Sequence, residues 1–160
     1  MFEEYSFSRN KTEGFARRVR KNLDFIIKKR DENEDIHEVT QLAISLLGLI
    51  IFPWEANALQ YLENLPLDEL MSKGWPKWDI QLDEKNDTKT LGKLTFHLRN
   101  AASHRRLKFS SDERDLHKVE IEFEDAPNKI APPNWRAKIN AADLKEFCDR
   151  FTKLLEDIVG

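Results

Sequence analysis

The chain has 160 residues, with 26 lysines and arginines against 29 aspartates and glutamates, so its net charge is -3. This balance excludes a uniformly basic nucleic-acid binder, and 40% hydrophobic with 34% charged residues is typical of one globular domain over residues 1–160 rather than of a disordered or membrane protein. A single cysteine excludes an intramolecular disulfide, and the acidic, aromatic N-terminus does not resemble a signal peptide. We therefore expect a cytoplasmic protein.

The first half of the chain is expected to be helical. Apolar residues recur at helical spacing over residues 12–31, and again from about residue 35 to residue 52, just before a proline. The second run is too short for a membrane span of about 20 residues, so it predicts a buried helix. Shorter helices are predicted at Glu55–Asn64 and Leu67–Ser72, and the stretch Gly74–Thr88 is predicted to be an irregular loop.

The second half mixes helix and strand. A helix is predicted from Thr88, with leucines and alanines on one stripe. Apolar residues then alternate with glutamates over residues 119–124 and with arginine and lysine over 135–139, which predicts two antiparallel strands whose opposite charges pair. Leu107–Phe109 is a candidate third strand, and a last helix begins at residue 140 or 141. The predicted fold is mainly α, a bundle of four to five helices with a small β-hairpin inserted before the C-terminal helix.

Basic residues are concentrated in two segments. Arg9–Arg30 holds nine lysines and arginines against two acids, and the segment 99–108 holds Arg99, Arg105, Arg106 and Lys108 with no acid. Taken alone, such segments are more often solvated helix faces than contacts for a polyanion such as RNA.

The segment Arg99–His104 contains groups that phosphodiester cleavage requires. Arg99 offers a permanently charged guanidinium for a phosphate, Asn100 an amide and His104 an imidazole that can transfer a proton. On an ideal helix, Arg99 and His104 diverge by about 140°. One helix therefore does not close both around one phosphate, whereas two helices related by a dimer axis could line a shared cleft.

Several residues near this segment have two readings. His97 lies one heptad before His104 and could line the same surface, although a partly buried structural histidine is the more common case. Two explanations fit the cations Arg105, Arg106 and Lys108 equally well. They could bind the phosphates of an RNA backbone, or they could stabilise the negative C-terminal end of a helix. The four tryptophans are more often core or interface anchors than platforms for bases. The sequence has no metal-ligand spacing, glycine-rich phosphate loop or nucleophile motif, so no metal or cofactor is expected.

The pattern of Arg99, Asn100 and His104 resembles that of a known family, the HEPN domains (higher eukaryotes and prokaryotes nucleotide-binding). Many of these are up-and-down helical-bundle ribonucleases marked by an arginine, a polar residue, a few spacers and a histidine. The segment Ser103–Arg106, the run Gly48–Glu55 and the late hairpin resemble one plasmid- and prophage-associated subfamily.

The resemblance implies a metal-independent endoribonuclease that acts as a homodimer, often as a toxin or phage-defence effector restrained by an antitoxin or other regulatory protein. His104 would be the general base or acid, Arg99 would stabilise the phosphorane, and Asn100 would hold the phosphate or the imidazole. Arg105, Arg106, Lys108 and His97 would bind RNA. The alternative is a HEPN-type module that binds RNA or nucleotide, or dimerises, without cutting.

Overall fold

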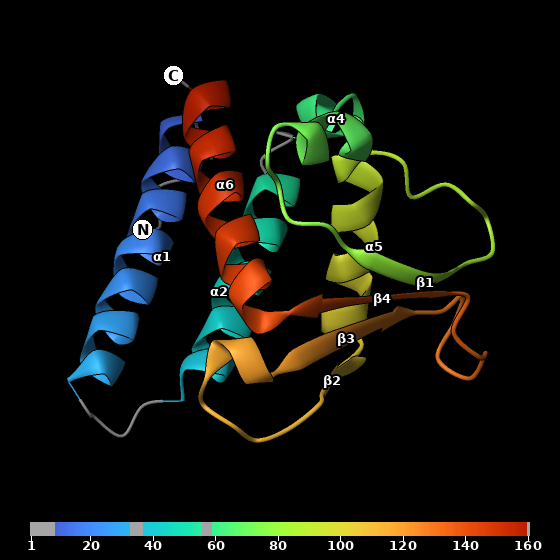
Figure 1. The fold of residues 1–160 in the computed structure, drawn as a ribbon. Coiled ribbons are helices and arrows are strands. Elements are labelled where there is room, and N and C mark those ends of the chain that lie inside the picture. Colours follow the sequence, from blue (N-terminus) through green and yellow to red (C-terminus); the bar gives the residue numbers. More distant parts are fainter. Residues whose placement is uncertain (1–8, 33–36, 56–58, 160) are drawn as a thin grey trace, which may run out of the picture.

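The structure is a computed structural model that describes residues 9–32, 37–55 and 59–159 (Figure 1). Over the described residues, the chain forms in order α1 (Arg9–Asp31), α2 (Glu38–Glu55), α3 (Leu59–Glu63), α4 (Leu67–Ser72), β1 (Asp79–Asp83), α5 (Leu91–Ser103), β2 (Leu107–Phe109), the 3₁₀ helix η1 (Leu116–Lys118), β3 (Glu120–Asp125), β4 (Trp135–Asn140) and α6 (Ala141–Val159).

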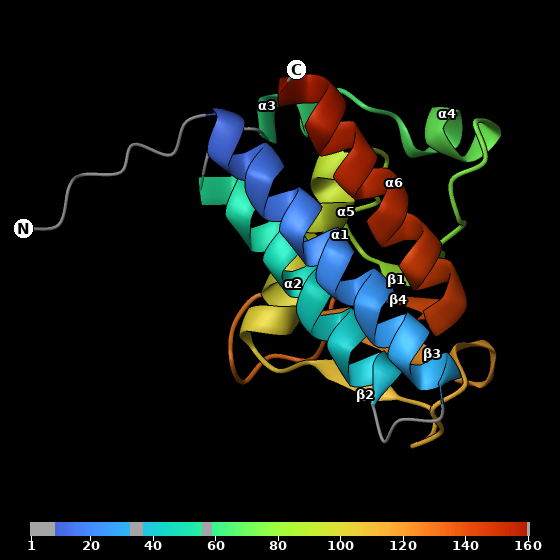
Figure 2. The same cartoon turned by 90° about the vertical axis from the view of Figure 1, so that its left-hand side faces the viewer.

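The helices form a layer beside a small sheet. The long helices α1, α2 and α6 pack against one another, and α5 packs between α2 and strand β3 (Figures 1 and 2). Their buried faces are rich in leucine and phenylalanine, as the helical periodicity predicts; examples are Leu42, Leu94 and Phe151, each 0% exposed. Over the part of the chain described, no helix has an apolar stretch long enough to cross a membrane.

The sheet is larger than the predicted hairpin. Strands β3 and β4 form that hairpin, but β2 and β1 flank it, and the four strands lie in the antiparallel order β1-β4-β3-β2. Strand β2 confirms the candidate at Leu107–Phe109, whereas β1 lies inside the stretch that was predicted to be an irregular loop. Strand β1 is a half-exposed edge strand, and its register with β4 is irregular between Ile80 and Leu82. Its conformation therefore depends more on pairing with β4 than on its own sequence of apolar and polar residues, which is why it was not predicted.

The hairpin has the predicted charge pairing. Glu122 lies opposite Lys138 and Glu124 opposite Arg136. The corresponding ion pairs measure 3.5 Å for Lys138 Nζ to Glu122 Oε2 and 2.8 Å for Arg136 Nη2 to Glu124 Oε1. The other face of the hairpin is buried and faces α5, so the alternation of apolar and charged residues separates the inner face of the sheet from the outer one.

Several helix boundaries differ from the predicted ones, and two of these differences have a local cause. Helix α2 continues to Glu55, two residues past the proline that was predicted to stop it. A proline near the last turn removes a single backbone hydrogen bond, so it does not force the helix to end there. Helix α5 begins at Leu91 rather than near Thr88, because Thr90 is its N-cap and its hydroxyl accepts a hydrogen bond of 3.3 Å from the Lys93 amide.

Candidate active site

The candidate catalytic residues lie at the C-terminal end of α5. Arg99 and Asn100 are half-buried on its last turns, while His104 is exposed. Helix α5 ends at Ser103 and His104 is its C-cap, with φ -102° and ψ 11°. His104 therefore lies one residue beyond the end of α5 rather than within it, although its amide still donates to the Asn100 carbonyl at 3.1 Å, as in a helical turn.

The chain leaves α5 through a turn that places Arg105 in the left-handed region, at φ 58°. The amide of Arg106 donates to the Ala101 carbonyl at 2.7 Å and that of Arg105 to the Ala102 carbonyl at 3.1 Å. These two bonds define a Schellman motif, whose left-handed residue is usually glycine because a side chain there costs about 1–2 kcal/mol. Helix α4 ends in the same motif, and there the left-handed residue is Gly74, at φ 91°.

We expect Arg105→Gly to raise the free energy of unfolding by about 0.5–1 kcal/mol, since glycine removes the steric cost but has more freedom in the unfolded chain. The measurement is urea denaturation of both proteins. Gly74→Ala is the matched control and should lower the stability by about 1 kcal/mol, because its Cβ would also lie 3.2 Å from Arg150 Nη2. If Arg105→Gly is destabilising, the Arg105 side chain makes contacts that outweigh its backbone cost.

A buried carboxylate holds Asn100 in place. Asp125, at the end of β3, is 6% exposed. Its Oδ2 accepts a hydrogen bond of 3.1 Å from Asn100 Nδ2 and lies 2.8 Å from His97 Nδ1, while its Oδ1 accepts from the Ala126 amide at 2.8 Å. Because an ionised carboxylate only accepts, these contacts place a proton on His97 Nδ1. Residues from β3 and α5 therefore fix the amide beside Arg99.

His97 lies beneath the surface. It is 7% exposed, and its ring stacks on Trp135 with centroids 4.7 Å apart and an interplanar angle of 8°. Trp135 Nε1 in turn donates to Thr88 Oγ1 at 2.9 Å. This placement agrees with the structural reading of His97 and leaves its ring little surface for the RNA contact that the sequence predicted. Trp135 and Trp78, at 1% and 6% exposure, are core residues.

Two aspartates flank the His97 ring. Its second nitrogen, Nε2, is 3.5 Å from Asp87 Oδ1, and Asp87 also contacts Lys93 at 3.2 Å. Burial alone would raise the pKa of Asp125, but hydrogen bonds from His97, Asn100 and the Ala126 amide outweigh it and lower the pKa below its usual value. At Asp87, burial also raises the pKa, but the contacts with Lys93 and His97 outweigh this effect and lower the pKa below its usual value. Both carboxylates are therefore ionised at neutral pH.

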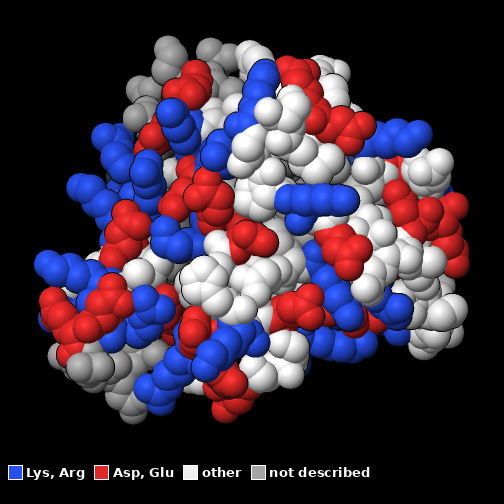
Figure 3. Space-filling view, viewed as in Figure 1, with Lys and Arg blue, Asp and Glu red and all other residues white. Residues whose placement is uncertain are grey.

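The predicted RNA-binding cations have different partners. Arg105 is exposed beside His104, whereas Arg106 donates from Nη2 to the Asn128 carbonyl at 2.9 Å. Lys108 lies on the outer face of the sheet, where Glu124 and Glu122, at 3.1 and 3.3 Å, raise its pKa. These glutamates offset its charge. On the face in Figure 3, acidic and basic side chains are mixed, and blue side chains gather at the left, over α1.

Asp125 and Asp87 were not among the residues predicted from the sequence. A signal for Asp125 was present, because residues of a strand alternate between faces and Asp125 follows Ile121 and Phe123 on the inner one. An acid at a buried position of a strand requires hydrogen-bond partners, and these would have been sought on the helix that packs there. For Asp87, which lies in the loop before α5, the sequence offers no comparable signal.

The family model described as HEPN pEK499 p136 matches residues 2–160. No curated protein and no solved structure matches the chain.

Proposed function

Because the chain belongs to the HEPN pEK499 p136 family, which its model matches over residues 2–160, we propose that it is a metal-independent endoribonuclease acting as a homodimer. The observation that carries the proposal is the set Arg99, Asn100 and His104 at the end of α5, with Asn100 held by the buried Asp125. The set unites a cation, a fixed amide and an exposed imidazole, which are the groups that an RNA phosphodiester needs for cleavage.

The proposed reaction is attack of a ribose 2′-hydroxyl on the adjacent phosphorus. His104 accepts the 2′-hydroxyl proton or donates one to the leaving 5′-oxygen, and Arg99 neutralises the charge that develops on the phosphorane oxygens. The bond from phosphorus to O5′ breaks as the bond to O2′ forms, which leaves a 2′,3′-cyclic phosphate and a 5′-hydroxyl. The requirement for the 2′-hydroxyl makes RNA, and not DNA, the substrate.

The number of available histidines supports the dimer. The reaction needs one group that accepts a proton and another that donates one. Of the four histidines in the chain, His97 is buried, His117 lies in η1 and His37 precedes α2, which leaves His104 at the end of α5. Two protomers related by a two-fold axis bring two copies of His104 to one cleft, one as base and one as acid.

The proposed biological setting is a toxin or phage-defence effector. An enzyme that cleaves cellular RNA has to be restrained, and an antitoxin or another regulatory protein is the proposed partner for that purpose. Arg105, exposed next to His104, is the cation best placed to contact the RNA backbone in this arrangement.

We expect the purified protein to cleave single-stranded or structured RNA in the presence of EDTA. The measurement uses end-labelled RNA and reads the product ends, which should be a 2′,3′-cyclic phosphate and a 5′-hydroxyl. DNA of the same sequence is the control and should stay intact. RNA that is bound but never cut would instead support the non-catalytic module, and products ending in 3′-hydroxyl would contradict the proposed chemistry.

A further inference from the structure

Helix α2 has a second uncharged stripe that faces away from the core. Residues 39–54 include no aspartate, glutamate, lysine or arginine, although 34% of the whole chain is charged. One side of the helix faces the core through residues such as Leu42 and Leu46, both 0% exposed. The opposite side has its own stripe at helical spacing, here named the α2 outer face: Thr40, Ile44, Leu47 and Gly48.

The α2 outer face is open to solvent. Ile44 is 55% exposed, Thr40 is exposed, and Leu47 and Gly48 are half-buried. A surface helix usually turns charged residues toward water, and a helix that is apolar on all sides is normally buried. Helix α2 instead lies beside α1 on the near side of the molecule in Figure 2. Its pattern therefore indicates that another molecule covers this face.

The apolar surface continues from α2 toward the candidate active site. Phe109, the last residue of β2, is 45% exposed. It lines one hollow together with Val39 and Thr40 from the start of α2. Phe109 follows His104 by five residues, a length of chain that spans at most about 18 Å. A molecule seated on the α2 outer face and Phe109 thus lies close to His104.

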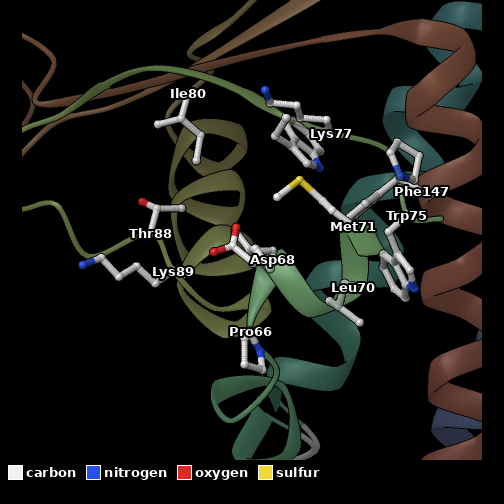
Figure 4. A pocket seen from close by; sticks show the side chains of 13 residues that line it. Pro66, Asp68, Leu70, Met71, Trp75, Lys77, Ile80, Thr88, Lys89 and Phe147 are labelled. Atoms are coloured by element: carbon white, nitrogen blue, oxygen red, sulfur yellow. The ribbon is translucent and has the colours of Figure 1, made fainter. Parts of the chain in front are cut away.

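Other exposed apolar regions are bordered by charge. Phe25 on α1 is 59% exposed, but Lys29 Nζ lies over its ring at 6.0 Å. The apolar cavity of about 430 Å³ between α4 and β1 is lined by Asp68, Lys77 and Lys89 as well (Figure 4). In a two-fold dimer a patch meets its own copy, so charges near the axis would oppose identical charges. The α2 outer face avoids this repulsion, which favours a second copy of the chain as its occupant.

We propose that the α2 outer face, together with Phe109, is the surface on which a second copy of this chain docks. The inference rests on the proposed homodimer and identifies its interface. A stable interface buries about 800 Å² on each partner. One side of the 18-residue helix α2, about 27 Å long and 10 Å wide, provides about a third of that, so β2 and the end of α5 contribute the rest. The partner then lies where the proposed reaction needs a second histidine.

The first test is sedimentation equilibrium over a range of protein concentrations. The unmodified protein should have twice the mass of one chain. Ile44→Glu should raise the dissociation constant of the dimer by at least about 100-fold, because each dimer would bury two unpaired carboxylates. Phe25→Glu is the matched control, since it places the same charge on an equally exposed apolar position of α1, and it should leave the dissociation constant unchanged. Circular dichroism checks that both variants fold.

The second test uses the unmodified chain, so it does not depend on the folding of a variant. Hydroxyl-radical labelling of Ile44, Leu47 and Phe109 should fall as the protein concentration rises through the dissociation constant, while labelling of Phe25 stays constant. A protein that remains monomeric at 100 μM, or a dimer in which these three side chains are labelled as in the monomer, would overturn the interface. Protection of α2 in the monomer would also overturn it, because a segment of the same chain would then cover the face.

RNA cleavage by the same proteins separates this inference from the proposed function. Ile44→Glu should lose cleavage together with dimerisation, whereas Phe25→Glu should keep both. If the unmodified chain dimerises through this face and cuts no RNA, the proposed function is wrong and the interface stands. If the unmodified chain cuts RNA as a monomer, the interface is wrong and the ribonuclease activity stands.

Discussion

His104→Ala is expected to lower the rate of RNA cleavage by about 10²–10⁴-fold, because it removes the proposed proton-transfer group. The free energy of unfolding should change by less than about 0.5 kcal/mol, since His104 is exposed at the end of α5. Arg99→Ala should lower the rate by about 10²–10³-fold through loss of charge stabilisation in the transition state. The effects are measured as single-turnover rates of cleavage of a DNA strand that contains one ribonucleotide.

His117→Ala is the matched control, because His117 is also exposed but lies in η1. Its rate should equal that of the unmodified protein. A rate for His104→Ala within a factor of three of the parent would remove His104 from the proposed site. Loss of activity together with loss of folding, seen by circular dichroism, would assign His104 a structural role instead.

A mixed dimer tests whether two chains share one site. If one cleft needs His104 from both protomers, a dimer of one parental chain and one His104→Ala chain lacks either the base or the acid. Such a mixed dimer should then cleave RNA no faster than the His104→Ala dimer. If each protomer uses its own Arg99 and His104, the mixed dimer keeps about half of the parental activity.

The fold could be predicted from the sequence wherever a segment follows its own periodicity. The long helices and the β3/β4 hairpin obey periods of 3.6 and 2, and both were predicted, together with the Glu122–Lys138 and Glu124–Arg136 pairs across the strands. Strand β1 was not, because an edge strand with an irregular register takes its conformation from its partner. A sheet of four strands was therefore underestimated as a hairpin.

The candidate site could be predicted only in part, for a related reason. Arg99, Asn100 and His104 are close in sequence, so a motif contains them. Asp125 lies 25 positions beyond Asn100 and reaches it only because β3 packs against α5. The end of α5 was also missed by one residue, because the motif that stops it has Arg105 where glycine is the usual signal.

Asp125→Ala should have the largest effect on stability, lowering the free energy of unfolding by about 3 kcal/mol. It removes the acceptor for His97, Asn100 and the Ala126 amide, and buried donors left unpaired are costly. Asp125→Asn keeps the size but supplies one acceptor oxygen for three donors, so a loss of about 1–2 kcal/mol is expected. Urea denaturation measures both, with Asp157→Asn, exposed on α6, as the control.

The pH dependence of this loss identifies the charge of Asp125 as its cause. The pKa of Asp125 is lowered in the folded protein, so its ionised form contributes stability above the usual aspartate pKa of about 3.9, and that contribution is lost as the pH falls through the lowered value. The difference in unfolding free energy between the parent and Asp125→Asn should therefore be constant near neutral pH and shrink below about pH 4. A difference that does not change with pH would assign the loss to packing alone.

A double-mutant cycle then connects this cluster to catalysis. If Asp125 acts by holding Asn100, Asp125→Asn lowers the cleavage rate of the folded protein, and it lowers the rate no further once Asn100→Ala is present. If Asp125 acts only through the stability of the fold, the two effects on the rate are additive. A non-additive result would show that the carboxylate of β3 positions the amide of α5, so that the sheet is part of the site and not only a support for the helices.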